Sequence, residues 1–148
     1  VIGAIDMLPV NAQNELAEAI KETSSNEGLN LIMALSYSSK WEIVNATKSI
    51  IDDVLAGKLN KEQITQDAFS KYLSTKNYPD PELLIRTSNE YRISNFLLYQ
   101  IAYSELYFTH VLWPDFRKNN LYEAILNYQK RERRFGKTGD QIKQEEIS

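Results

Sequence analysis

Short runs of apolar and β-branched residues alternate along this chain with longer stretches whose apolar residues recur at helical spacing. This alternation constrains the fold more than any other feature, because strands that alternate with helices form a largely parallel sheet. Each helix then returns the chain to the edge from which the next strand starts. We therefore expect an α/β fold with a mostly parallel sheet and helices on both of its faces.

The expected limits of these elements follow from the residues that start and stop them. Ser38 or Ser39 is a suitable N-cap for a helix over 38–59, and Gly57 is a suitable stop near its end. The expected strands are 1–6, 27–36, 83–88 and 105–112. The expected helices are 11–25, 38–59, a shorter one within 60–82, 94–104, and a final one from near Asp115 to Gly136.

The composition is that of an ordinary globular protein, with 43% hydrophobic and 25% charged residues in a chain of 148. We expect one domain over 1–136 and a disordered polar tail over 137–148. No apolar run approaches the roughly 20 residues of a membrane-spanning helix, so a cytoplasmic location is expected. The chain has no cysteine and a single histidine, His110, which excludes thiolate nucleophiles and multi-histidine metal sites. A net charge of −3 argues against a nucleic-acid partner.

All six arginines lie at or after residue 86, whereas every basic residue before that position is a lysine. The guanidinium group matches phosphate and carboxylate geometry, so an anion site is expected late in the chain. Arg86 ends an expected strand, Arg92 lies in the following loop, and Ser94 stands where a helix N-cap would. Ligands of parallel sheets bind beyond the carboxyl ends of the strands, and helix N-termini favour phosphate. The three residues are therefore placed to converge on a diphosphate.

A purely structural interpretation of this loop stays open on the residues alone. The two arginines would then pair with the carboxylates of Glu90, Glu105 or Asp115, while Ser94 would only cap a helix. A nucleotide-binding interpretation is weaker, because the sequence contains no Gly-x-Gly-x-x-Gly motif.

The segment "DPELLIRTSNEYRISNFLLYQIAYSELYFTHVLWPDF", residues 80–116, closely resembles the signature of the cis-prenyltransferases, and within them of the bacterial undecaprenyl diphosphate synthases. The resemblance continues in "RERRFG" at 131–136 and, more weakly, in "ALSYSSKWEIVNA" and "VIGAID". It therefore covers nearly the whole chain and implies the fold of that family.

The resemblance also implies a reaction and a set of site residues. Enzymes of this family add isopentenyl diphosphate units to farnesyl diphosphate and make a long cis-polyprenyl diphosphate. By this likeness, Arg86, Arg92 and Ser94 bind isopentenyl diphosphate, and Glu105 helps to hold Mg²⁺. For Glu105 the alternative is a structural carboxylate that neutralises one of the two arginines.

Arg134 and Gly136 match the Arg-x-Gly element of the family, which reaches across a homodimer to the diphosphate site of the partner. These residues also suit the basic last turn and the C-cap of a helix. The aromatic residues around the signature are expected to pack in the core or the dimer face rather than to touch substrate; they are Tyr99, Tyr103, Tyr107, Phe108 and Trp113. Release of a lipid product implies contact with a membrane.

The family's loop of the "MDGNGRWA" type, which supplies the catalytic aspartate and holds the allylic diphosphate, does not occur in this sequence. We therefore expect this chain to be the C-terminal part of a longer enzyme, with the aspartate upstream of Val1, and to be inactive alone. The alternative is a non-catalytic partner subunit that supplies its Arg-x-Gly tail to another chain. Asn89 stands where the family usually has glycine, and asparagine tolerates the left-handed backbone of such a turn.

Overall fold

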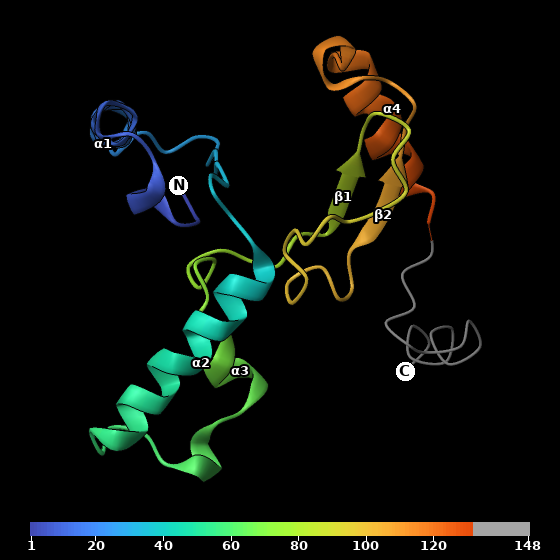
Figure 1. Cartoon of the computed structure of the whole chain (residues 1–148). Helices are drawn as coiled ribbons and strands as arrows, with labels where there is room; N and C mark the ends of the chain where they lie inside the picture. The colour runs from blue at the N-terminus through green and yellow to red at the C-terminus, as the bar shows by residue number, and fades with distance from the viewer. Residues whose placement is uncertain (132–148) are drawn as a thin grey trace, which may run out of the picture. The chain divides into compact units, whose positions relative to one another are not determined.

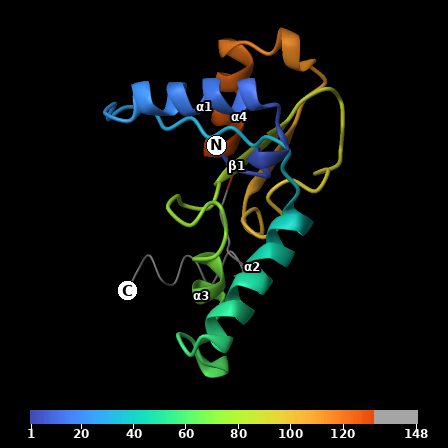
Figure 2. The same cartoon turned by 60° about the vertical axis from the view of Figure 1, so that its left-hand side comes forward.

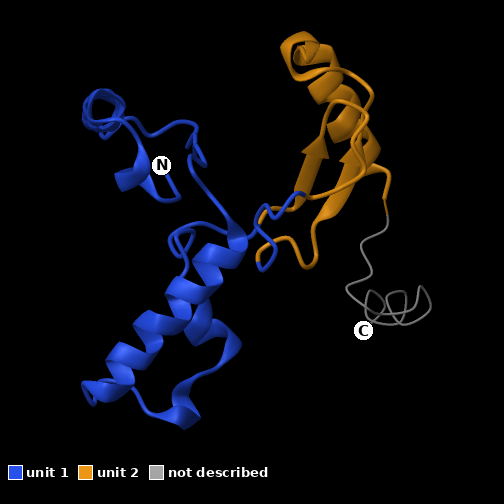
Figure 3. Cartoon of the chain, in the orientation of Figure 1, with its two compact units in different colours: residues 1–80, 94–99 blue, residues 81–93, 100–148 orange. Residues whose placement is uncertain are grey.

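The structure is a computed structural model that describes residues 1–131 of the chain. It divides into two compact units, which Figure 3 distinguishes by colour. The first unit holds residues 1–80 and 94–99, and the second holds 81–93 and the described residues from 100 onward. The expectation of one domain over 1–136 stays a prediction.

The first unit is mainly helical (Figure 1). Its α-helices are α1 (Val10–Thr23), α2 (Ser39–Leu55) and α3 (Gln66–Ser70), and its 3-10 helices are η1 (Ile5–Met7) and η2 (Lys61–Gln63). The short helix α3 packs beside α2, as the two views in Figures 1 and 2 show. The expected helix over 11–25 is confirmed as α1, and the helical pattern within 60–82 yields only the short α3 and η2.

Helix α2 forms where its capping residues and its apolar spacing predict it. The Ser38 side chain accepts a hydrogen bond from the backbone N–H of Trp41, which satisfies one of the free donors at the helix start. Beyond the end of α2, Gly57 takes a φ of 71°, a conformation that costs glycine little. Between these ends, Ala46 and Ile50 lie four residues apart on one face and are buried.

The strands expected at 1–6 and 27–36 meet in a single parallel bridge, between Ile2 and Ala34. The Ile2 N–H donates to the Met33 carbonyl at 2.9 Å, and the Leu35 N–H donates to the Ile2 carbonyl at 3.0 Å. Full strands were therefore a wrong prediction over these ranges, although the parallel direction is confirmed. A strand forms only against a partner, and the apolar run before the bridge finds none among the described residues, with Leu29 94% exposed.

The second unit is built on a two-stranded parallel sheet of β1 (Leu83–Arg86) and β2 (Glu105–Phe108). Leu83 lies opposite Glu105, and Arg86 lies opposite Phe108. After β2 come the 3-10 helix η3 (Trp113–Asp115) and α4 (Lys118–Gln129), which packs against β2. The α/β class with parallel strands is confirmed, but the strands are shorter than the expected 83–88 and 105–112.

The helix expected over 94–104 does not form, and this prediction was wrong. Its residues make a series of turns, and Ser94, Asn95 and Leu97 have φ values of 54°, 61° and 47°. A left-handed backbone cannot continue a right-handed helix, so Ser94 caps no helix here. The final helix begins at Lys118 rather than near Asp115, and its expected end at Gly136 lies outside the described residues, as does the expected tail.

Among residues 1–131, no helix is both long enough and apolar enough to cross a bilayer.

Candidate functional site

The loop that leaves β1 is tied to the segment that leaves β2 at the same edge of the sheet. The Thr109 N–H donates to the Arg86 carbonyl at 2.9 Å, which continues the strand pairing beyond β2. The Ser88 N–H then donates to the Val111 carbonyl at 2.8 Å, and the Asn89 N–H donates to the Thr109 carbonyl at 3.0 Å. The loop therefore stands at the carboxyl edge of the parallel strands, where ligands of such sheets bind.

The turn in this loop has the left-handed backbone expected from its sequence. Ser88 has a φ of 69° and Asn89 a φ of 55°, so asparagine keeps the conformation that glycine would take most easily. The Tyr91 hydroxyl donates to the Asn89 side-chain oxygen at 3.1 Å, and the Tyr91 ring lies 5.4 Å from that of Phe108, centroid to centroid. These contacts fix the turn against the end of β2.

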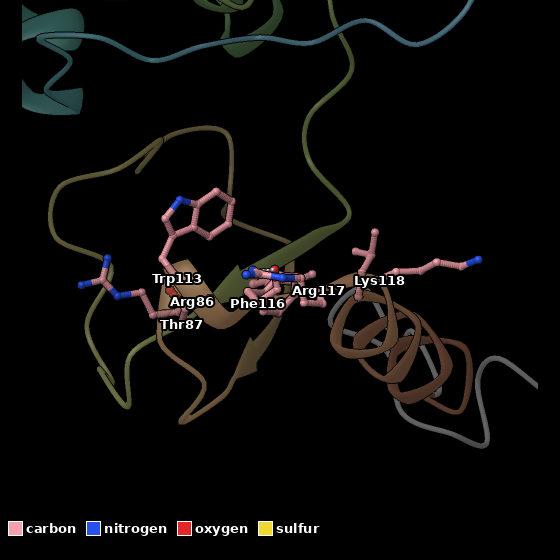
Figure 4. A pocket seen from close by; sticks show the side chains of 8 residues that line it. Arg86, Thr87, Trp113, Phe116, Arg117 and Lys118 are labelled. Atoms are coloured by element: carbon pink, nitrogen blue, oxygen red, sulfur yellow. Dashed lines mark hydrogen bonds between the residues drawn. The ribbon is translucent and has the colours of Figure 1, made fainter.

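Arg86 lines a cavity of about 640 Å³ at this edge, shown in Figure 4, which we call the Arg86 cavity. The residues that line it come from the end of β1 and from the η3–α4 region; they are Ile85, Arg86, Thr87, Trp113, Phe116, Arg117, Lys118 and Leu121. The Arg86 Nε atom is buried and has no hydrogen-bond partner among the described residues. An unsatisfied buried donor on a cation is unfavourable unless a ligand supplies the acceptor.

The other cations of the Arg86 cavity flank the start of α4. The Arg117 guanidinium donates to the backbone carbonyls of Pro114 and Phe116, which holds it close to its own turn. The Lys118 ammonium lies 5.3 Å from the centroid of the Tyr122 ring, and Figure 4 shows its side chain extending away from the other labelled side chains. The cavity thus combines positive charge with the apolar surfaces of Trp113 and Leu121, a combination that suits an anion with a short apolar tail.

Arg92 and Ser94 do not line the Arg86 cavity. Arg92 forms an ion pair with Glu90, with its side chain 67% exposed, as the structural interpretation of the loop allowed. Ser94 belongs to the first unit, whereas the two arginines belong to the second. The convergence of the three residues on one ligand therefore stays a prediction. Arg134 and Gly136 lie outside the described residues.

Glu105 pairs with Arg131 rather than with Arg86 or Arg92, the partners of the structural alternative, and its expected role toward Mg²⁺ stays a prediction. The Arg131 Nη1 atom lies 2.7 Å from the Glu105 Oε2 atom and also donates to the Leu106 carbonyl at 2.9 Å. The Asn127 side chain accepts two further hydrogen bonds from the same guanidinium. No cluster of three acidic or histidine side chains that could hold a metal occurs among residues 1–131. The site thus fits Mg²⁺ only as one carboxylate that adds to oxygens from a diphosphate.

Two residues of the cavity were missed by sequence reasoning, Trp113 and Arg117. Trp113 was expected to pack in the core or the dimer face; its ring stacks on Phe116 with centroids 6.2 Å apart, although the residue is 71% exposed. Tyr103 is 72% exposed, and its place on a dimer face stays a prediction. Tyr99 does pack, with its ring centroid 5.1 Å from that of Phe69. The signal that was available is the "WPDFRK" stretch, which places an aromatic residue and two cations just before a helix.

A scan against protein families matches residues 1–136 to the family described as "Putative undecaprenyl diphosphate synthase". An isoprenyl transferase of Chlorobaculum tepidum is 54% identical over 147 residues, which are 99% of this chain and 56% of that protein. An isoprenyl transferase of Porphyromonas gingivalis is 49% identical and is matched by 95% of this chain over 56% of its own length. The chain thus spans about half the length of the curated relatives it matches.

Two solved structures are similar as well. Lavandulyl diphosphate synthase from Lavandula x intermedia, in complex with dimethylallyl diphosphate, superimposes with a TM-score of 0.89 at 36% identity, over 92% of this chain and 58% of that chain. A probable undecaprenyl diphosphate synthase from Campylobacter jejuni gives a TM-score of 0.76 at 32% identity, over 92% of this chain and 61% of that chain.

Proposed function

This chain belongs to the undecaprenyl diphosphate synthase family, and we propose that it carries the isopentenyl diphosphate half-site of a cis-prenyltransferase. The proposed reaction joins isopentenyl diphosphate units to an allylic diphosphate, farnesyl diphosphate, and yields a long cis-polyprenyl diphosphate. At each addition the isopentenyl double bond forms the new carbon–carbon bond, the allylic diphosphate leaves, and one proton is lost from the isopentenyl unit. A prenyl diphosphate is also the ligand in the solved lavandulyl diphosphate synthase structure, which supports this class of substrate.

One observation carries the proposal: Arg86 lines the cavity at the carboxyl edge of the strands, and its Nε atom is buried without a hydrogen-bond partner among residues 1–131. A diphosphate oxygen would accept a hydrogen bond from this atom and would balance the charge of the guanidinium. The five-carbon isopentenyl group would then lie against apolar side chains of the cavity such as Trp113 and Phe116. The anion and the short tail of this substrate thus each find a matching surface.

Arg92 and Ser94 would complete the grip on the diphosphate. The ion pair between Arg92 and Glu90 is largely exposed, and such pairs contribute only about 0–1 kcal/mol. A diphosphate carries more charge than one carboxylate and would therefore replace Glu90 as the partner of Arg92. The role of these residues is to hold the isopentenyl double bond in position for attack on the allylic carbon, so they act mainly through orientation.

Glu105 would hold Mg²⁺ together with diphosphate oxygens, and the bound ion would neutralise negative charge on the substrate. Arg131 would then share the carboxylate with the ion or give it up. Arg134 and Gly136 would reach the site of a second copy in a homodimer, as the family element implies. We place the protein in the cytoplasm, with membrane contact when the lipid product leaves.

The test is replacement of Arg86 by alanine in the protein at its natural length. Loss of a charge-assisted, bidentate contact of about 3 kcal/mol should raise the KM for isopentenyl diphosphate about a hundredfold. The KM for farnesyl diphosphate should change little, and Arg86→Lys should recover only part of the loss because lysine cannot bind in the same fork geometry.

Lys48→Ala, which removes an exposed cation from α2, is the matched control and should leave both KM values unchanged. Arg92→Ala should raise the KM for isopentenyl diphosphate by a smaller factor, about tenfold, because its side chain is more exposed. If Arg86→Ala and Arg92→Ala both keep near wild-type KM and kcat, the proposed half-site is wrong.

A further inference from the structure

The segment Ser94–Tyr99, which follows the Arg92 loop, is bound by the first residues of α2. The Ser39 N–H donates to the Asn95 carbonyl at 3.0 Å, and the Ser39 hydroxyl accepts from the Leu98 N–H at 2.9 Å. The Lys40 N–H donates to the Asn95 side-chain oxygen at 3.0 Å, while the Asn95 amide group donates to the Ser38 hydroxyl at 2.7 Å. We call these contacts the serine clamp.

The serine clamp holds a backbone that would not keep its conformation alone. Ser94, Asn95 and Leu97 all have positive φ values, although none of them is glycine. Such conformations cost free energy and persist only where surrounding contacts determine them. Here Ser39 is fully buried, so its hydrogen bonds form without competition from water.

Aromatic contacts add to the serine clamp on the same segment. The Phe96 ring meets the Tyr37 ring edge to face, with centroids 5.9 Å apart. The Tyr99 hydroxyl donates to the Gln66 carbonyl at 3.2 Å. All of these residues belong to the first unit, as Figure 3 shows, so the segment is part of the body of that unit rather than a mobile linker.

We propose that the serine clamp positions Ser94 for the diphosphate of isopentenyl diphosphate. This inference rests on the proposed function. Asn95 is bonded directly to Ser94, so the hydrogen bonds that hold the Asn95 backbone and side chain also restrict the Ser94 backbone from which the hydroxyl extends. Ser38, Ser39 and Asn95 are thus positioning residues that act on the substrate without touching it.

The experiment measures separate KM values for the two substrates in variants of the natural-length protein. Ser39→Ala removes the hydroxyl that accepts from the Leu98 N–H and should raise the KM for isopentenyl diphosphate about tenfold. The KM for farnesyl diphosphate should stay within about twofold, because the allylic substrate is not expected to contact this loop. Ser49→Ala, at an exposed position on the same helix, is the control and should change neither value.

Substitutions at Asn95 separate the hydrogen bonds from the backbone strain. Asn95→Gly keeps the positive φ but loses both side-chain bonds, so it should raise the KM for isopentenyl diphosphate. Asn95→Asp keeps the acceptor for the Lys40 N–H and should rescue part of the effect. Hydrogen exchange at the Leu98 amide gives a readout that does not depend on activity, and Ser39→Ala should accelerate it. If Ser39→Ala does not fold, Ser38→Ala and the Asn95 pair carry the test.

The outcomes distinguish this inference from the proposed function. If Arg92→Ala raises the KM for isopentenyl diphosphate while Ser39→Ala and Asn95→Gly do not, the clamp has no positioning role and the half-site stands. If Arg86→Ala, Arg92→Ala, Ser39→Ala and Asn95→Gly all leave the KM for isopentenyl diphosphate unchanged, both proposals fail. Equal rises of both KM values in the clamp variants would show a general loss of structure and would also overturn the positioning role.

Discussion

Two loops that follow each other along the chain, 87–93 and 94–99, are held by opposite means. The first is tied to the segment after β2 through backbone bonds such as Ser88 N–H to the Val111 carbonyl, and its charged side chains stay at the surface. The second is fixed to the start of α2 by side-chain hydrogen bonds of Ser38, Ser39 and Asn95, of which Ser39 is fully buried. Within a few residues, the chain therefore changes from a loop whose charged side chains can exchange partners to a segment that is held in one conformation.

This difference shows how the charged side chains of a loop can exchange partners while the segment that follows keeps a fixed conformation. Exposed ion pairs exchange partners at little cost, so in the proposed half-site Arg92 would leave Glu90 for the diphosphate. Side chains held only in that way lose entropy when a ligand orders them. A segment that is already fixed, such as the one that carries Ser94, would lose less on binding.

The largest expected effect comes from replacing Glu42 of α2, the helix that holds the segment 94–99. Its carboxylate is 3% exposed and accepts hydrogen bonds from the Tyr37 hydroxyl and, at 2.9 Å, from the Ser74 N–H. Glu42→Ala should lower the free energy of unfolding by about 3 kcal/mol, because it removes a buried, charged acceptor from the Tyr37 hydroxyl and the Ser74 N–H. Glu42→Gln keeps one acceptor oxygen and should cost less.

Urea unfolding of these two variants measures the effect, with Glu15→Ala at an exposed position on α1 as the matched control. Because the Tyr37 ring packs on Phe96, Glu42→Ala should also speed hydrogen exchange in the segment 94–99. A variant with unchanged stability would mean that the carboxylate does not hold this segment.

Local signals in the sequence predicted the parts of the fold that depend on local interactions. Helix α2 was expected from a serine N-cap, a glycine stop and apolar spacing, all within one stretch of chain. The helix expected over 94–104 failed although its apolar spacing looks helical. Its backbone is set by bonds from Asn95 and Leu98 to serines more than fifty residues earlier, which no local pattern reveals.

The candidate site shows the same limit. Arg86 could be placed because the end of a buried strand beside a loop is a local feature, and the structure puts it in a cavity at that edge. The partner of Glu105 could not be read from the sequence, since Arg131 lies 26 residues away on the chain beyond α4. Trp113 was assigned to packing because aromatic residues usually pack, and its ring does stack on Phe116; that the indole also lines the cavity was not visible in the sequence.

A smaller effect is expected from the loop 87–93, at Asn89. Its φ of 55° is one that alanine adopts only at a cost of about 1 kcal/mol, so Asn89→Ala should destabilise the protein by about that amount. Asn89→Gly removes the same side chain but fits the left-handed backbone and should be nearly neutral. Thermal unfolding of the two variants checks this difference; equal destabilisation would place the cost in the lost contact with Tyr91 instead of in the backbone.

The smallest effect concerns the response of the first unit to acid, through Asp53 on α2. The Tyr72 hydroxyl donates to Asp53 Oδ2 at 2.8 Å, and the Lys58 ammonium lies 3.1 Å from Asp53 Oδ1. The hydrogen bond from Tyr72 lowers the pKa of the Asp53 carboxyl below its ordinary value, and Lys58 lowers it further. When the pKa of a carboxyl group is lower in the folded state than in the unfolded state, its charged form stabilises the fold at pH values above the unfolded-state pKa. This contribution is lost as the pH falls through the folded-state pKa.

Tyr72→Phe should therefore be less stable than the wild type at about pH 7, and the difference should shrink below about pH 4. Tyr78→Phe, at an exposed tyrosine in the same unit, is the control and should show no such pH dependence. The chain has two tryptophans, Trp41 in the first unit and Trp113 in the second, so Trp113→Phe leaves fluorescence that reports the first unit alone. Parallel loss of stability in Tyr72→Phe and the wild type over this whole range would rule out the Asp53 carboxylate as the source of the pH dependence.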